Sequence, residues 1–206
     1  MGLSTVIPYQ LSRIQPHTFA PFSKRLKRLF DSMDKKYQEA ADYYGFNCMG
    51  CEENCCLTRF YHHTLLEYLF IYDGFKTLDR EQQNKIKHRA AEVCRHTDLA
   101  DEKNQPVRLM CPLNSDGMCL LYAYRPMICR LFGIPHELQQ HGMEIVYHPG
   151  CDVFSEQCSG KRYFKFNRTP FFIKMANMEL ELRQTVGIRQ KIKLTVAQMI
   201  KTFGDG

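Results

Sequence analysis

The sequence lacks the segments that carry proteins into or across membranes. No apolar run approaches the roughly 18 residues of a membrane-spanning helix, and the longest, from Leu65 to Tyr72, is interrupted by Glu67. The first residues do not combine a basic with an apolar segment, as a secretory signal would, and Val6 stands where a myristoylation motif needs Ser or Thr. We therefore expect a cytoplasmic protein with no membrane partner.

The sequence also lacks the motifs of several common function classes. It has no glycine-rich nucleotide loop, no evident nucleophile–base pair and no internal repeat or low-complexity stretch. No run of Arg and Lys is longer than two residues, and no nucleic-acid-binding motif is present. These absences argue against a dinucleotide enzyme and against nucleic acid as a partner.

Length and charge set the next limits. With 206 residues and 44% hydrophobic side chains, the chain can build one core without a metal on grounds of size. Residues 1–47 carry 7 basic and 4 acidic side chains, residues 48–158 carry 11 and 15, and residues 159–206 carry 10 and 3. The basic C-terminal region is a solvated face, packs on the acidic middle region, or contacts a protein or other anionic partner.

Periodicity predicts a mainly α fold with a few short strands. We expect an extended lead-in over residues 1–20 and a single metal-stabilised domain over 21–206, with its cysteine-rich loops in a core of about 45–135. Caps at Gly45, Asp79 and Thr169 help to set the helix ends. The predicted helices are 22–45, 58–72, 79–95, 119–124, 169–185 and 194–203, the predicted strands are 107–110 and 143–147, and 114–117 is a turn.

Cysteine is abundant and clustered, with ten in the chain. Four fall within nine residues, and five more are spaced along the following hundred. Cys94 stands apart on the apolar face of a predicted helix, and we expect it in the core. In a reducing cytosol clustered cysteines indicate metal ligands or redox thiols, although the even count leaves disulfides open. The candidate metal ligands are Cys48, Cys51, Cys55, Cys56, Cys111, Cys119, Cys129, Cys151 and Cys158.

Thiolate is a soft, anionic ligand that favours zinc and iron–sulfur assemblies. Because a zinc ion or an iron–sulfur cluster takes about four thiolates, the candidates exceed one site, and we expect more than one metal ion. Spacing does not choose between zinc and iron. Neighbouring side chains diverge, so one of Cys55 and Cys56 should face a second centre or the far side of a shared one.

The second cysteine set carries a recognisable pattern. Cys111-Pro112-Leu113, then Cys119-Leu120-Leu121-Tyr122, then Arg125-Pro126-Met127-Ile128-Cys129-Arg130 follow the knot of residues 48–56. Together they resemble the YkgJ-like CxxCxxCC cysteine-cluster family, whose domains are described as zinc- or iron-chelating. The group of four cysteines at residues 48–56 has three residues between its second and third cysteines, where the family name implies two.

The resemblance covers roughly residues 45–135. It implies metal binding by Cys48, Cys51, Cys55, Cys56, Cys111, Cys119 and Cys129. A relative in the wider group is flagellin lysine N-methylase, so the alternative is a redox or methyl-transferring enzyme that uses the metal centre.

Charged and histidine residues near the cysteines add weaker candidates. Arg125 and Arg130 flank Cys129, where they would form surface salt bridges or neutralise thiolate charge. Each histidine alone is more typical of a surface or core position than of a ligand. The histidines in question are His62, His63, His136, His141 and His148, of which His148 is the best placed in sequence.

Overall fold

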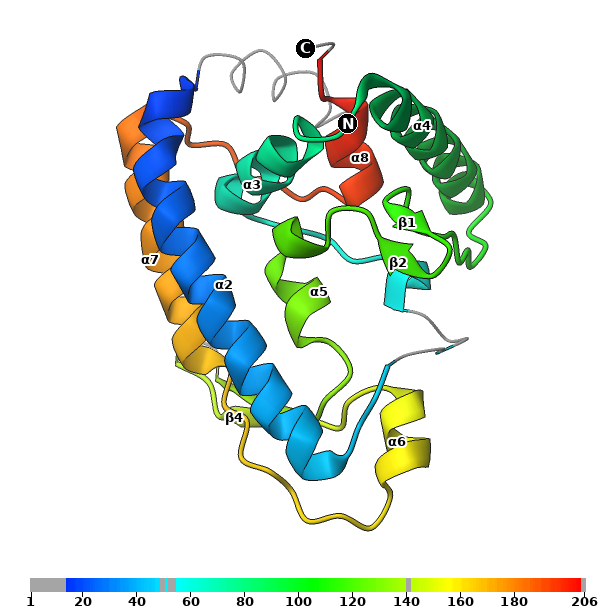
Figure 1. Ribbon diagram of the computed structural model, residues 1–206, viewed down its shortest axis with the longest axis vertical. Helices are drawn as coiled ribbons and strands as arrows, with labels where there is room; N and C mark the ends of the chain where they lie inside the picture. The colour runs from blue at the N-terminus through cyan, green and yellow to red at the C-terminus, as the bar shows by residue number, and fades with distance from the viewer. Residues whose placement is uncertain (1–13, 49–50, 52–54, 140–141, 205–206) are drawn as a thin grey trace.

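The computed structural model describes residues 14–48, 51, 55–139 and 142–204, and the chain is mainly helical (Figure 1), which confirms the predicted fold class. None of the helices in these ranges is long and apolar enough to cross a membrane. The helices are α2 (Pro16–Tyr44), α3 (Leu65–Phe75), α4 (Arg80–Glu102), α5 (Met127–Leu131), α6 (Asp152–Cys158), α7 (Thr169–Val186) and α8 (Val196–Lys201), with 3₁₀ turns η1 (Cys55–Leu57) and η2 (Tyr122–Tyr124).

Helix α2 is the long edge of the molecule, and it begins earlier than predicted. Pro16 occupies its first turn, where the missing amide costs nothing, and Phe19 extends the buried stripe that the prediction started at Phe22. Residues 16–20 are therefore helical rather than an extended lead-in, while residues 1–13 of that prediction lie outside the described residues. Gly45 ends the helix in a left-handed conformation, as predicted.

The core forms where α2 meets α3, α5 and α7. The rings of Phe30 on α2 and Phe70 on α3 meet edge to face with centroids 5.2 Å apart. Helix α3 buries nearly every residue, as predicted, but it starts at Leu65 because Thr64 caps it by accepting the Glu67 amide. Residues 58–63, predicted as helix, instead run in a largely irregular segment in which His62 pairs with Leu194.

Helix α4 begins as the sequence indicates and ends later. The Asp79 side chain accepts the Gln82 amide at 2.8 Å and caps the helix. The helix then continues past the predicted end at residue 95 to Glu102, with Ile86, Ala90 and Cys94 buried. Cys94 therefore lies in the core as expected. Helix α8 packs against α4 and carries a capping box between Thr195 and Gln198.

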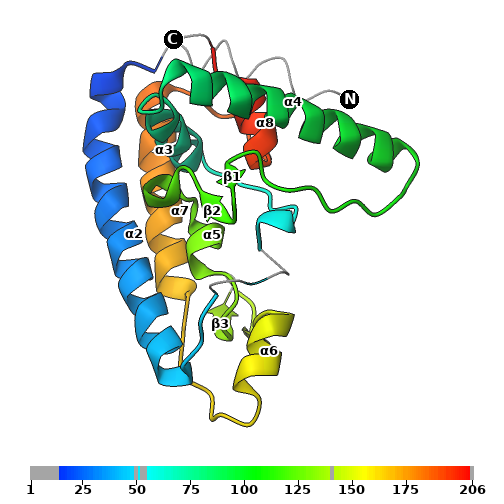
Figure 2. The ribbon, with the colours of Figure 1, turned by 45° about the vertical axis from the view of Figure 1, so that its right-hand side comes forward.

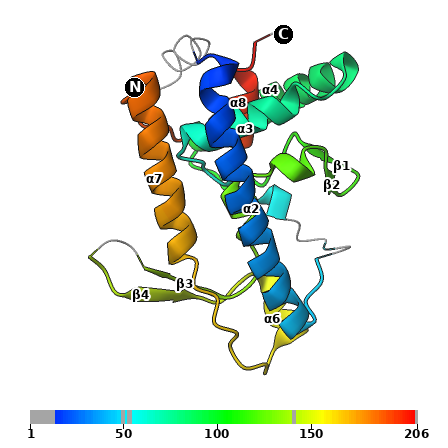
Figure 3. The ribbon, with the colours of Figure 1, turned by 60° about the vertical axis from the view of Figure 1, so that its left-hand side comes forward.

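Two short antiparallel hairpins complete the fold. Strands β1 (Asn114–Ser115) and β2 (Met118–Cys119) are joined by Asp116 and Gly117, both at positive φ, which confirms the predicted turn. Strand β4 (Ile145–His148) matches one predicted strand and pairs with β3 (His136–Gln139), in a hairpin at the foot of α7 (Figure 3). Residues 107–110, predicted as a strand, are irregular.

The remaining differences concern short helices. Cys119 ends β2 and residues 122–124 form the turn η2, so the helix predicted over residues 119–124 is absent and α5 begins only after its cap residue Pro126. Helix α6 was not predicted, because its seven residues are too few for a clear period. Helix α7 starts at Thr169 as predicted, but Arg168 is the cap residue before it.

Candidate metal centre

Four of the short elements carry most of the cysteines to one side of the molecule. Figures 1 and 2 show η1, the β1–β2 hairpin and α6 on the side away from α7, with α5 between them. The Cys111 amide donates to the Cys56 carbonyl at 2.9 Å, and Cys119 pairs with Asn114 across the hairpin. Segments separated by about fifty residues are thereby joined. No disulfide links any of the ten cysteines, all of which are among the described residues.

Cys56, Cys111, Cys119 and Cys129 form what we call the first cluster. Burial raises the pKa of the Cys111 thiol to about 12, and the nearby Cys56 and Cys119 contribute to the rise. Burial likewise raises the pKa of Cys129 well above its ordinary value, with Cys111, Cys119 and Cys56 adding to it. These mutual effects place the four thiols within electrostatic range of one another. At neutral pH, Cys111 and Cys129 are protonated in the metal-free protein.

The side chains of Cys55 and Cys56 were predicted to diverge, but the two thiols interact with each other. The 3₁₀ turn at η1 lets the Cys55 thiol donate to the Cys56 sulfur, which raises the pKa of Cys55 and lowers that of Cys56. The Asn114 amide and the charge of Arg125 further lower the pKa of Cys56. Cys56 is thus the thiol of the first cluster best prepared to be anionic at neutral pH.

Cys48, Cys51 and Cys151 form a second cluster beside the first. The Cys48 sulfur lies 3.8 Å from the Tyr37 hydroxyl. Although Cys48 as a residue is exposed, packing around its thiol raises its pKa, and Cys151 and Cys51 add to that rise. The Cys151 sulfur caps α6 by accepting the Phe154 amide at 3.4 Å.

Two glycines hold this second cluster in place. Gly150 lies at positive φ with its Cα against the Gly133 carbonyl, so that a Cβ there would sit 2.6 Å from that oxygen. A Cβ on Gly133 would stand 3.5 Å from the Tyr37 hydroxyl and 3.6 Å from the Cys151 sulfur. The Tyr37 hydroxyl and the Cys151 thiol therefore face the same small space. Any residue larger than glycine at position 150 would push the backbone segments around residues 133 and 150 apart.

Cys158 differs from the other predicted ligands. It is 5% exposed at the end of α6, where its thiol donates to the Tyr44 carbonyl at 3.6 Å within an apolar cluster. Like Cys94, it is placed as a core residue. The structure thus brings seven of the nine predicted ligands into two adjacent clusters, places Cys55 beside Cys56 of the first, and sets Cys158 apart from both.

The two arginines beside Cys129 have different surroundings. Arg125 stacks on the Tyr122 ring at 3.6 Å, and its charge lowers the pKa values of Cys48, Cys56 and Cys119. Arg130 is 5% exposed and is tied to Asp34, to the Ala123 and Arg125 carbonyls and to the Phe30 ring. Arg125 is therefore placed to offset thiolate charge, whereas Arg130 mainly joins α5 to α2.

The described candidate histidines lie outside both clusters. His148 stacks on His136 across the β3–β4 hairpin, with ring centroids 4.7 Å apart. His62 is buried with its Nδ1 3.9 Å from a Glu67 carboxylate oxygen. His63 is exposed, and His141 lies outside the described residues.

Glu67 is a buried acid within the apolar run of residues 65–72. Burial alone would raise its pKa, but His62, the Thr64 hydroxyl and the Met127 amide together outweigh burial and lower it. Its carboxylate accepts the Met127 amide at 3.0 Å and so fixes the start of α5, the helix that carries Cys129. No pattern in the sequence identifies this contact, because it joins residues 60 positions apart.

Within the described ranges, no group of three or more histidine, cysteine or acidic side chains is already arranged to hold a metal ion. The sulfurs of each cluster are near one another but do not point at a common centre. Residues 49–50 and 52–54 lie outside the described ranges.

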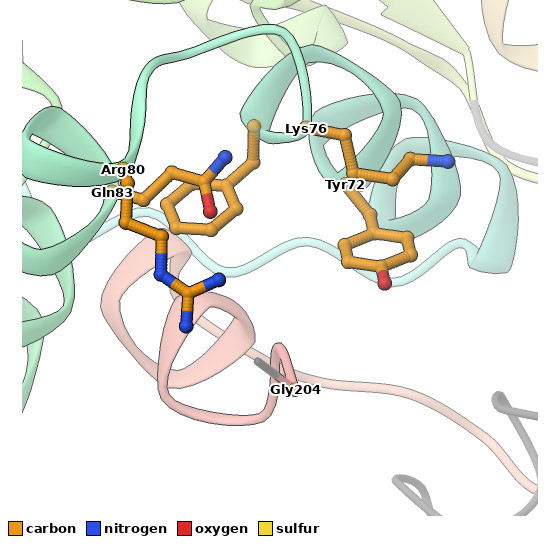
Figure 4. Close-up of a pocket in the computed structure, with 6 residues that line it drawn as sticks. Tyr72, Lys76, Arg80, Gln83 and Gly204 are labelled. Carbon is orange, nitrogen blue, oxygen red and sulfur yellow. The ribbon is translucent and has the colours of Figure 1, made fainter. Parts of the chain in front are cut away.

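A surface pocket of about 200 Å³ lies away from the cysteines, between the end of α3, the start of α4 and the C-terminal segment (Figure 4). Its lining is aromatic and basic, and the Lys76 ammonium stands over the Tyr72 ring at 4.8 Å. The lining residues are Tyr72, Phe75, Lys76, Arg80, Gln83 and Gly204. None of them contributes to either cysteine cluster.

No protein-family model, curated protein or solved structure matches this chain. The resemblance to the YkgJ-like family therefore rests on the motif residues alone.

Proposed function

We propose that this protein binds zinc or iron, the latter as an ion or in an iron–sulfur cluster, through its clustered cysteine thiolates. The observation that carries the proposal is the meeting of Cys56, Cys111, Cys119 and Cys129, which come from three separate segments of chain. Four thiols within electrostatic range of one another match the ligand number of a structural zinc or an iron–sulfur cluster. The resemblance to zinc- or iron-chelating domains supports the same proposal.

The surroundings of the first cluster fit such a metal. Four thiolates on a divalent ion leave a net negative charge, and the guanidinium of Arg125 already favours the anionic forms of Cys56 and Cys119. The Asn114 side-chain amide supplies a hydrogen-bond donor beside Cys56. Bound zinc would cross-link the short elements, and an iron–sulfur cluster would also carry electrons.

The test is metal analysis of the full chain purified with and without oxygen. We expect stoichiometric zinc in a colourless protein, or iron in a brown protein with visible absorption. Cys129→Ser should lower the metal content, since Cys129 interacts with the other three thiols of the first cluster. Cys94→Ser serves as the control, because Cys94 lies in the core next to α8 rather than among the clustered thiols. Equal metal content in both variants and the parent protein would remove the first cluster from the proposal.

A further inference from the structure

Arg168 is a buried cation to which the described residues offer the Phe166 ring, 5.1 Å from the guanidinium carbon, but no carboxylate. Its residue surface is 2% exposed, its Nη2 donates to the Ile134 carbonyl at 3.3 Å, and its Nε has no hydrogen-bond partner. No carboxylate forms an ion pair with it anywhere in the described ranges. An unpaired buried charge costs several kcal/mol, so a stable arrangement needs a counter-charge nearby.

The residues around Arg168 limit what that counter-charge is. His136 shares the Ile134 carbonyl through its Nδ1 at 3.2 Å, and burial followed by the charge of Arg168 lowers its pKa to about 4. His136 is therefore neutral at neutral pH and supplies no charge of either sign. The other electrostatic neighbours are the phenols of Tyr37 and Tyr163, which are also neutral there.

Two thiols of the second cluster lie beside Tyr37. The Tyr37 hydroxyl stands 3.8 Å from the Cys48 sulfur and faces the same space as Cys151. Tyr37 interacts electrostatically with Cys48 and Cys151 and also with Arg168. Tyr37 thus connects the buried guanidinium with two thiols of the second cluster.

We infer that Cys48, Cys51 and Cys151 bind a second metal ion, separate from that of the first cluster, and that Arg168 and Tyr37 are positioning residues that balance its charge. Three thiolates on a divalent ion carry a net charge of about −1, which one guanidinium offsets. The Tyr37 hydroxyl donates a hydrogen bond toward the Cys48 thiolate. The inference rests on the proposed function and divides its ligands between two centres.

The experiment measures metal per chain and the affinity of each metal by chelator competition, using the full chain loaded anaerobically with zinc. Cys151→Ser should remove one metal and leave the other, and Cys129→Ser should remove the other. Cys158→Ala, seven residues from Cys151 on the same short helix, is the matched control and should retain both. A parent protein without stoichiometric metal would contradict the proposed function itself. A parent with one metal, lost in Cys129→Ser and kept in Cys151→Ser, would overturn only this inference.

The role of Arg168 is tested in the same assay. Arg168→Gln and Tyr37→Phe should each weaken the second metal by about 10- to 100-fold and leave the first unchanged. Arg168→Lys keeps the positive charge and should recover part of the loss, and the exposed Arg162→Gln should have no effect. If Arg168→Gln fails to fold, the affinities of Tyr37→Phe and Arg168→Lys for the second metal decide whether the assignment stands. Affinity of the second metal within twofold of the parent in Tyr37→Phe, or equal weakening of both metals in any variant, would overturn the assignment.

Discussion

The helical half of the molecule and its cysteine half are built on different principles. In the helical half, α2, α3 and α4 are 11 to 29 residues long and bury aromatic and aliphatic side chains against one another. In the cysteine half, β1 and β2 have two residues each, η1 has three and α5 has five. Elements this short are not stable alone, and they must be held by contacts from elsewhere.

The contrast shows where a metal would matter. The helical half is held by apolar side chains that pack without help from the clustered cysteines. In the cysteine half the elements are held by the Cys111–Cys56 backbone bond, by the bond from the Met127 amide to Glu67 and by the packing of α5 against α2. On the proposed function, bound metal adds the missing cross-links, so the two halves should respond differently to its removal.

The largest effect should come from removing the metal. Binding free energies of structural zinc are on the order of 10 kcal/mol or more, so a strong chelator should unfold the cysteine half while the helical half persists. Hydrogen exchange should then rise in β1, β2 and α5 and stay slow in α2 and α4. A uniform rise over both halves, or no change in either, would break the distinction.

The converse change should destabilise the helical half. Phe30→Ala removes a ring that is 1% exposed and should lower the free energy of unfolding by about 3–5 kcal/mol. Chemical denaturation measures the loss, and Leu180→Ala, at a side chain 57% exposed on α7, should cost little. Metal per folded chain should not change. A marked loss of metal from the folded Phe30→Ala protein would show that the halves are not independent.

Glu67 joins the two halves, and its substitution should have an intermediate effect. Glu67→Gln weakens the anchoring of the Met127 amide and should cost about 1–3 kcal/mol. Since folding lowers the pKa of Glu67, its contribution is present above the ordinary pKa of about 4.3 and is lost as the pH falls through the folded value.

Denaturation curves of the parent and of Glu67→Gln should therefore converge at acid pH. The exposed Glu92→Gln is the control and should follow the parent at every pH. A constant difference between parent and Glu67→Gln from neutral to acid pH would contradict the role given to the ionised carboxylate.

The last effect is on metal affinity rather than on folding, and it concerns protons in the cysteine half. The raised pKa values of Cys111, Cys119 and Cys129 mean that metal binding must displace protons. Affinity should rise by about tenfold, or about 1.4 kcal/mol, per pH unit for each proton released, over about pH 6 to 8. Calorimetry in buffers of different ionisation enthalpy counts those protons. Binding that is independent of pH and releases no proton would contradict thiolate ligation.

The sequence predicted the helical half better than the cysteine half, for physical reasons. Asp79, Gly45 and the Asp116–Gly117 turn act locally, and each was found because capping and turn preferences depend on adjacent residues. The early start of α2 was missed because Pro8, Pro16 and mixed polar residues suggested an extended segment, whereas Phe19 is buried by tertiary packing.

The candidate site was only partly predictable. Spacing identified the cysteines, but it could not separate Cys158, which belongs to the core, from Cys151, seven residues earlier. Tyr37 and Arg168 were beyond the reach of sequence patterns, since they meet only when α2 and the start of α7 come together. The interaction between the Cys55 and Cys56 thiols likewise depends on a 3₁₀ turn that the sequence spacing does not reveal.

The most direct test of the central claim is the identity and number of metal ions in the full chain purified without oxygen. The account predicts zinc or iron in stoichiometric amount, with more than one metal ion per chain. A folded, helical protein that holds no metal above trace after exposure to both zinc and iron would contradict it.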